Sequence, residues 1–375
     1  MYSIVNEIVK LRDGQLFEID YENTNRYRIV VKEKDGSKTA YYFSTPIYNN
    51  KTKKILDFKF CQRNDEFYCD RSNTEIIFSD KIMFENEVGS CAINISNFIF
   101  GEEGENLKRG NDYIYPTTNG ILYKMRCDTK KTISFEIEVD KPFMTVRSNN
   151  KYVAIMSESF VPFVSICCIG STNAENEIIA PAIIGYQKLT DNKFLISIST
   201  PCPTATWVMF EVNMYEQKTF QDTTVESANP TVNNAFGSIG FIGHTDIYGE
   251  QWLYTKPDFY KFNDIIDNKI SKVMMHIPQL NSSETTLSAF KLASRFCSFG
   301  SAWDNRVSST NMVEYSCLKN GYQNIDITEM VIDRFGRLTQ SDGCIIRTKN
   351  KDDSFCVIST SDSYYRPQIY EINFR

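Results

Sequence analysis

Histidine is the scarcest of the side chains that can do acid–base or metal chemistry in this chain. Of 375 residues, two are histidine, His244 and His276. This scarcity argues against Ser–His, Cys–His and histidine–metal mechanisms, which need an imidazole as base or ligand. His244 and Asp246 form a two-ligand metal pattern, but an ordinary loop is the favoured interpretation. His276 lies in an alternating segment, which indicates a structural role, and we predict no metal site.

Carboxylates are plentiful, and they leave one enzymatic alternative open. A glycosidase needs an acid and a nucleophile or base held about 5–10 Å apart. The chain has 47 Asp and Glu residues, and none of them stands in a recognisable motif. We therefore predict a protein that is not an enzyme, with a polysaccharide-active enzyme as the weakest of three hypotheses.

Aromatic residues of the C-terminal third suggest a different chemistry, carbohydrate binding. Sugar faces stack on exposed aromatic rings, and planar polar groups bind their hydroxyls. The candidate residues for such a site are Trp252, Tyr254, Trp303, Asp304, Arg306 and Tyr315. The alternative is that Trp252 and most of the tyrosines only pack in the core or along strands. Calcium held by loop oxygens fits such a fold, with Asp352, Asp353 and Asp362 as acidic loop residues, although exposed turns are the favoured interpretation.

The elements that must position these residues are predominantly β-strands. Apolar and polar residues alternate with a period of two at 27–31, 133–139 and 270–280. Such segments recur about every 8–12 residues with turn residues between them, which is typical of β-sandwiches. Asp13-Gly14 and Asp35-Gly36 are turn signals, and Thr328 is a helix N-cap candidate. We predict an all-β protein of two jelly-roll-like β-sandwich domains with at most short helices.

A polar stretch marks the expected domain boundary. From Gln217 to Asn234 the chain loses its strand pattern and contains Asn229-Pro230. The sequence thus predicts an N-terminal β-sandwich at 1–216, a linker at 217–235 and a C-terminal β-sandwich at 236–375.

The order of motifs in the C-terminal part resembles the DNRLRE-domain family of bacterial β-sandwich modules, which are related to carbohydrate-binding modules. The matching segments are the tryptophan loop at Trp303, Ile325-Asp326-Ile327-Thr328-Glu329-Met330-Val331, Gly343-Cys344-Ile345-Ile346, Ser359-Thr360-Ser361 and Arg366-Pro367-Gln368-Ile369-Tyr370-Glu371-Ile372. They span a little over a third of the chain. The family pattern usually carries further tryptophans around the loop, and here Tyr315 stands near one such position. The resemblance implies a β-sandwich with a carbohydrate-binding role.

Composition limits the partners and the compartment. A net charge of -6 argues against nucleic-acid binding, which uses a basic face. The apolar run at 160–169 is much shorter than the ~20 residues of a membrane helix. The first ten residues lack the pattern of a secretion signal. The 11 cysteines, among them Cys91, Cys297 and Cys356 in apolar runs, are interpreted as buried free thiols in a reducing compartment.

These observations favour a non-enzymatic structural or adhesion protein, made in the cytoplasm, that forms part of a virion, a tail or another bacterial surface assembly. Its expected partners are copies of itself or other assembly subunits. The alternative is a carbohydrate-binding protein that recognises a cell-surface or dietary polysaccharide. Neither hypothesis requires a cofactor, apart from the calcium considered above.

Overall fold

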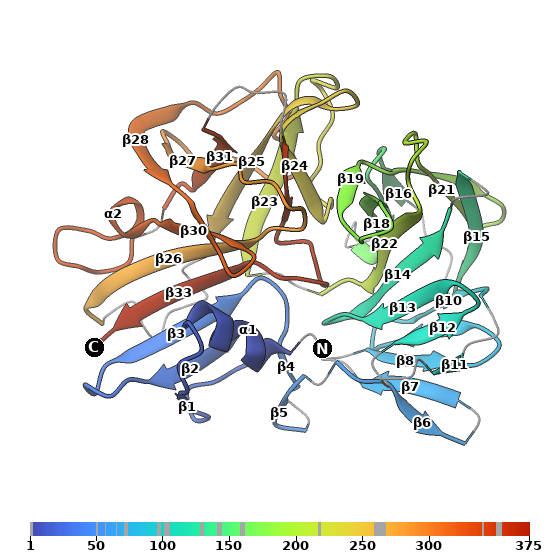
Figure 1. The fold of residues 1–375 in the computed structure, drawn as a ribbon, viewed down its shortest axis with the longest axis horizontal. Coiled ribbons are helices and arrows are strands. Elements are labelled where there is room, and N and C mark those ends of the chain that lie inside the picture. Colours follow the sequence, from blue (N-terminus) through green and yellow to red (C-terminus); the bar gives the residue numbers. More distant parts are fainter. Residues whose placement is uncertain are drawn as a thin grey trace. The chain divides into compact units, whose positions relative to one another are not determined.

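A computed structural model shows an all-β protein, as predicted (Figure 1). The structure describes residues 3–49, 52–56, 58–64, 66–70, 74–95, 99–100, 106–127, 131–140, 145–157, 162–216, 219–258, 268–339, 341–349 and 355–375. Most of these residues form antiparallel strands, and helices in these ranges are limited to α1 (Ile4–Leu11) and α2 (Thr328–Val331). The chain divides into two compact units, Met1–Ser3 with Lys51–Glu216 (unit 1) and Ile4–Asn50 with Gln217–Arg375 (unit 2).

Unit 1 is a β-sandwich of two antiparallel sheets. Sheet C has the order β20-β21-β15-β10-β9-β8-β7-β6, and sheet D has the order β11-β12-β13-β14-β22-β18-β17-β16, with β19 paired to β18. The strands of unit 1 are β5 (Lys54–Ile55), β6 (Cys61–Arg63), β7 (Glu66–Asp70), β8 (Glu75–Phe78), β9 (Ile82–Glu85), β10 (Ser90–Ile93), β11 (Ile99–Phe100), β12 (Leu107–Arg109), β13 (Asp112–Pro116), β14 (Gly120–Arg126), β15 (Thr132–Val139), β16 (Thr145–Ser148), β17 (Tyr152–Met156), β18 (Pro162–Thr172), β19 (Ile178–Ala180), β20 (Ile183–Lys188), β21 (Lys193–Ser199) and β22 (Trp207–Met214).

The core of unit 1 lies between sheets C and D. Strand alternation sends one face of each sheet inward, as in β21, where every second residue is buried. Three rings join the sheets at its centre. The Phe210 ring lies 5.3 Å from Tyr123 and 5.1 Å from Phe135, and it is nearly parallel to both. Because Phe135 belongs to sheet C and the other two to sheet D, this stack fixes the two layers face to face.

Unit 2 is also a two-sheet sandwich. Sheet A has the order β1-β2-β3-β33-β26-β30-β29, and sheet B has the order β28-β27-β31-β25-β24-β32, with β23 paired to β25. The strands of unit 2 are β1 (Glu18–Ile19), β2 (Arg28–Lys32), β3 (Lys38–Phe43), β4 (Tyr48–Asn49), β23 (Phe220–Glu226), β24 (Ile239–Thr245), β25 (Gly249–Pro257), β26 (Ile270–Pro278), β27 (Leu287–Leu292), β28 (Ser309–Tyr315), β29 (Cys317–Lys319), β30 (Tyr322–Asp326), β31 (Cys344–Thr348), β32 (Phe355–Ser359) and β33 (Ile369–Phe374).

The expected domain boundaries need correction at two places, the first strands of the chain and the polar stretch. Strands β2 and β3 were expected in the N-terminal domain, but β3 pairs with β33 from Lys38↔Phe374 to Phe43↔Ile369. Figure 1 shows β2, β3, β33 and β26 side by side in one sheet. The expected linker at 217–235 contains β23, which pairs with β25 along its whole length. Both differences arise because pairing between distant strands leaves no signal in either segment.

Side chains from both sheets fill the core of unit 2. Val30, Ala40 and Tyr42 come from the first strands of sheet A, and Leu253 and Ile346 come from sheet B. All five side chains are at most 2% exposed. Residues 4–50 therefore supply part of a core that the rest of unit 2 shares.

Gly343, in the Gly-Cys-Ile-Ile segment, is required by the close approach of two strands. Its φ is +98°, and a Cβ there would lie 2.6 Å from the carbonyl oxygen of Thr255 in β25. Any other residue would clash with that backbone atom while adopting a disfavoured conformation. The glycine of this segment is therefore a packing requirement of sheet B.

Helices α1 and α2 are short, and at each of them the structure differs from what the sequence predicted. The turn predicted at Asp13-Gly14 instead ends α1. Both residues have positive φ, and the Gly14 N–H donates to the Val9 carbonyl at 2.8 Å. The predicted helix at Thr328 is present, but Ile327 occupies the N-cap position. The Thr328 hydroxyl donates to Asp326 at 2.5 Å instead.

All 11 cysteines are free thiols. Seven of them are buried, whereas Cys297, expected inside an apolar run, is exposed together with Cys61 and Cys317. Burial raises the pKa of the Cys344 and Cys356 thiols to about 12. These two groups stay protonated at neutral pH and behave as small apolar side chains.

Candidate functional site

The structure brings three of the six predicted carbohydrate-binding residues together on the outer face of sheet B. The rings of Trp252 and Trp303 are 4.7 Å apart and tilted by 48°. The guanidinium carbon of Arg306 lies 3.9 Å from the Trp303 ring centre and 5.1 Å from that of Trp252. Both tryptophans are half-buried, and Arg306 is exposed.

Strand β25 and the loop between β27 and β28 position this group. Along β25, Leu253 points into the core, so its neighbours Trp252 and Tyr254 point outward. The loop then folds over the outer face, where Phe296 and Val307 pack against Tyr254 in a small apolar cluster.

Tyr254 is therefore a packing residue and not a ligand platform. It is fully buried, and its hydroxyl donates to the Val307 carbonyl at 3.2 Å. Burial raises the pKa of Tyr254 to about 12. The prediction of Tyr254 as a sugar-binding residue is corrected on this ground, since the loop covers its ring. The tyrosine instead holds the loop that carries Trp303.

Arg347 and Phe290 also belong to this group, and neither was predicted from the sequence. The guanidinium carbon of Arg347 in β31 lies 4.7 Å from the Trp252 ring and 4.1 Å from the Phe290 ring of β27. Burial lowers the pKa of Arg347. Its Nε is buried and has no hydrogen-bond partner within the described part of the chain. We call Trp252, Trp303, Arg306, Arg347 and Phe290 the tryptophan–arginine cluster.

The polar surroundings of the cluster fix its shape. Trp252 Nε1 donates to the Glu250 carboxylate at 2.8 Å, which sets the orientation of the indole. In the loop, the Asn305 side chain accepts from the Ala302 N–H at 2.7 Å and donates to the Gly300 carbonyl at 2.8 Å. These bonds hold the Trp303 loop in a closed turn next to the indole pair.

Asp304 and Tyr315 lie outside the cluster. The Asp304 side chain is exposed, and its backbone N–H donates to the Pro230 carbonyl at 3.0 Å. Tyr315 is 52% exposed on β28, where the Lys349 ammonium lies 4.8 Å from its ring centre. Its strand position matches Ser288, which in turn pairs with Arg347. Tyr315 thus shares the outer face of sheet B with the cluster, with Ser288 of β27 between it and Arg347.

The histidines and acidic loops form no metal site within the described residues. His276 is buried on sheet A, where Nδ1 lies 2.6 Å from Asn324 Oδ1 and Nε2 lies 3.2 Å from Glu371 Oε2. This agrees with the structural role predicted for it. Asp362, expected in an exposed turn, is buried. Asp352 and Asp353 lie outside the described residues.

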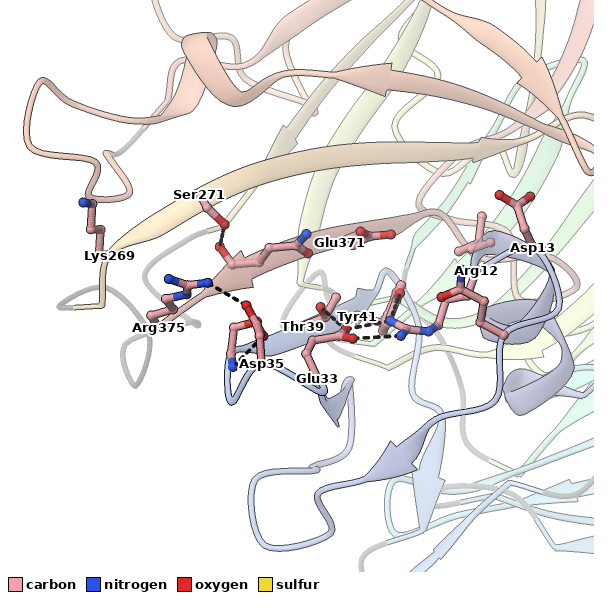
Figure 2. A pocket seen from close by; sticks show the side chains of 14 residues that line it. Arg12, Asp13, Glu33, Asp35, Thr39, Tyr41, Lys269, Ser271, Glu371 and Arg375 are labelled. Atoms are coloured by element: carbon pink, nitrogen blue, oxygen red, sulfur yellow. Dashed lines mark hydrogen bonds and ion pairs between the residues drawn. The ribbon is translucent and has the colours of Figure 1, made fainter.

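A second feature, unseen in the sequence, is a polar hollow on the outer face of sheet A. It has a volume of about 600 Å³ and is lined by the end of α1, the β2–β3 hairpin, the start of β26 and the end of β33. Figure 2 shows its side chains, with Arg12 against Glu33 and Arg375 against Asp35. Hydrogen bonds from Ser37 and Arg375 lower the pKa of Asp35 to about 2. The Arg12 hydrogen bonds likewise lower the pKa of Glu33.

No protein-family model and no curated protein matches this chain. The similarity to DNRLRE domains therefore stays a prediction. Among the described residues there is no helix with the length and apolar composition needed to cross a membrane.

Proposed function

We propose that this chain is a non-enzymatic adhesion protein whose unit 2 binds carbohydrate at the tryptophan–arginine cluster. The observation that carries the proposal is the convergence of Trp252 from β25 with Trp303 and Arg306 from the β27–β28 loop, at 3.9–5.1 Å. The DNRLRE-like order of motifs in the same unit supports the same ligand class.

The chemistry of the cluster suits a sugar. The indoles are half-buried on a sheet surface, so their remaining area is offered to solvent on a rigid support. The described residues place no hydrogen-bond acceptor against the Arg306 guanidinium, which leaves its N–H groups for ligand oxygens. Arg306 also covers one face of Trp303, so a bound sugar would use the open side of the pair.

Glycan binding is expected to depend on the two clustered tryptophans and not on the third. On a glycan array, the wild-type protein should retain a defined set of oligosaccharides. Trp252→Ala and Trp303→Ala should each weaken binding to the best of them by at least tenfold, about 1.4 kcal/mol, because each removes one of the two indoles that meet at the cluster. Titration calorimetry measures the change.

Trp207→Ala is the matched control for this experiment. Trp207 is also half-buried on a sheet surface and has a cation, Lys124, 4.2 Å from its ring centre, but it lies in unit 1. Equal losses in all three variants, or an array with no bound glycan, would contradict carbohydrate binding at the cluster.

We also propose that the protein is made in the cytoplasm and acts as a subunit of a virion, tail or other surface assembly. The observation in favour is an open edge at one end of unit 2. Strand β28 is the edge of sheet B, and β29, which follows it in the chain, is the edge of sheet A. Tyr315 and Leu318 are 52% and 42% exposed there. Unpaired edges with exposed apolar side chains favour pairing with another subunit. The free thiols fit synthesis in a reducing compartment.

Leu318→Lys is expected to disrupt this assembly. A charge at the edge opposes burial against a second subunit, so particles seen by electron microscopy and mass measurement should give way to monomers. Leu189→Lys is the matched control, because Leu189 has the same 42% exposure and lies in unit 1. A wild-type protein that stays monomeric in native material would rule out the assembly role.

A further inference from the structure

We infer that Asn320 is a site of spontaneous deamidation, and that its conversion to aspartate or isoaspartate loosens the C-terminal end of α1. Asn320 lies in the turn that joins β29 to β30, and α1 packs against this turn. The inference does not rest on the proposed function, because it concerns only the chemistry of the turn and its contact with the helix.

The chain has two Asn-Gly pairs, Asn119-Gly120 and Asn320-Gly321, and the structure separates them. Asn-Gly is a reactive sequence because glycine has no side chain to keep its backbone nitrogen from the asparagine side chain. Asn119 is fully buried, and a Cβ at Gly120 would collide with the Val212 carbonyl oxygen, so this pair has no room to rearrange. Asn320 and Gly321 instead form an exposed turn, with φ of +55° and +78°.

Deamidation at this turn passes through a cyclic imide. The backbone nitrogen of Gly321 attacks Cγ of Asn320, and a C–N bond forms. The Asn320 Nδ2 group takes up the proton that Gly321 loses and leaves as ammonia. Water then opens the ring at one of its two carbonyl groups, which gives aspartate or isoaspartate without any oxidation or reduction.

A cation beside Gly321 favours the attack. A Cβ built on Gly321 would lie 3.6 and 3.9 Å from the two terminal nitrogens of Arg366. A positive charge at such a distance stabilises both the anionic nitrogen that attacks and the oxyanion that forms. The Arg366 guanidinium is held in place by Glu7 of α1, 3.5 Å away.

The amide of Asn320 holds the end of α1. Nδ2 donates to the Lys10 carbonyl at 2.7 Å and to Asp13 Oδ1 at 3.3 Å. The Lys10 carbonyl belongs to the last turn of the helix, where carbonyl groups lack acceptor-to-donor bonds further along the helix. Lys319 completes the contact, with its ammonium 2.5 Å from Asp13 Oδ2.

Deamidation reverses the role of this side chain. The donor becomes a carboxylate that faces two acceptors, the Lys10 carbonyl and the Asp13 carboxylate. The hydrogen bonds are lost, two like charges face each other, and a negative charge lies at the negative end of the helix dipole. Glu7 stays bound to Tyr322 and Arg366 in the middle of α1, so the last turn is the part that loosens.

Peptide mapping by mass spectrometry, on the full-length protein kept at mildly alkaline pH, tests the reaction. The peptide with Asn320 should exchange NH2 for OH about tenfold faster than the peptide with Asn119, or more, because the buried pair must first open. Unfolded protein is the control, and there the two pairs should react at similar rates. Equal conversion at the two asparagines in the folded protein, or no conversion at Asn320, would overturn the inference.

Hydrogen–deuterium exchange measures the loosening of α1. Aspartate tolerates the positive φ of this position as asparagine does, so Asn320→Asp keeps the turn and mimics the product. Amides in the last turn of α1 should exchange about fivefold faster in this variant, the effect of one lost hydrogen bond. Asn320→Gly also fits the turn and removes the amide without adding a charge, so its exchange should lie between those of Asn320→Asp and the wild type. Wild-type exchange rates in Asn320→Asp would show that α1 does not depend on this amide, and the inference would be wrong.

Discussion

A fragment of residues 217–375 is expected to remain unfolded when it is produced alone. It lacks β2 and β3, so β33 loses the partner that pairs with it over six residues. It also lacks Val30, Ala40 and Tyr42, which are buried against both sheets. The burial of these three side chains is worth about 5 kcal/mol. That is comparable with the ~5–15 kcal/mol that stabilises a whole domain.

Circular dichroism and the dispersion of amide NMR signals measure this outcome. Residues 51–216 should fold alone, because they supply every strand of sheets C and D and every residue of the core cluster between them. A chain that joins residues 4–50 to residues 219–375 by a short glycine–serine linker should also fold. Residue 219 lies beside the first segment, since the Thr219 hydroxyl donates to the Phe43 carbonyl at 2.9 Å. A dispersed spectrum from 217–375 alone would refute the assignment of the first strands to unit 2.

Phe210→Ala is expected to destabilise unit 1 by about 3–5 kcal/mol. The Phe210 ring is fully buried and stacks on Tyr123 in its own sheet and on Phe135 in the opposite one. Its removal leaves a cavity where three rings meet, and it also removes two aromatic contacts worth about 0.5–1.5 kcal/mol each. Such a loss is a large fraction of the stability of one domain.

Urea denaturation followed by Trp207 fluorescence measures this change in a background with Trp252→Phe and Trp303→Phe. Trp207 then reports unit 1 alone, because it lies on β22, the strand that also carries Phe210. Phe210→Leu is the matched control and should cost much less, since it fills most of the space. A midpoint for Phe210→Ala equal to that of Phe210→Leu would show that the stack contributes little.

Local features of the fold were accessible from the sequence, and long-range ones were not. The alternation at 133–139 predicted a strand, and β15 spans Thr132–Val139. The Asp35-Gly36 signal predicted the turn that joins β2 and β3, where Gly36 has φ +85°. The pairing of β3 with β33 was missed, because the two strands lie far apart in the chain. The alternating pattern of each strand is equally compatible with pairing to other strands. The sequence likewise did not show that the consecutive strands β14 and β15 lie in different sheets, because alternation does not indicate which sheet a strand joins.

The candidate site shows the same limit at the scale of side chains. Residue type alone identified Trp252, Trp303 and Arg306, which meet in space. It also selected Tyr254, because nothing in the sequence shows that a later loop covers its ring. Arg347 was missed because its place beside Trp252 depends on the order in which the strands of sheet B are arranged. The hollow of sheet A was missed altogether, since its floor needs the pairing of β3 with β33.

The insertion of unit 1 between two segments of unit 2 has a consequence for synthesis on the ribosome. Strands β2 and β3 emerge roughly three hundred residues before β33 does. At about 5–20 residues per second, their partner is missing for some tens of seconds. During that interval unit 1 has all its strands and can fold, while the nascent β2–β3 hairpin keeps its apolar face uncovered. The middle of this polypeptide can thus reach its native state before the beginning does, and we expect its earliest strands to need protection from aggregation until the last one is made.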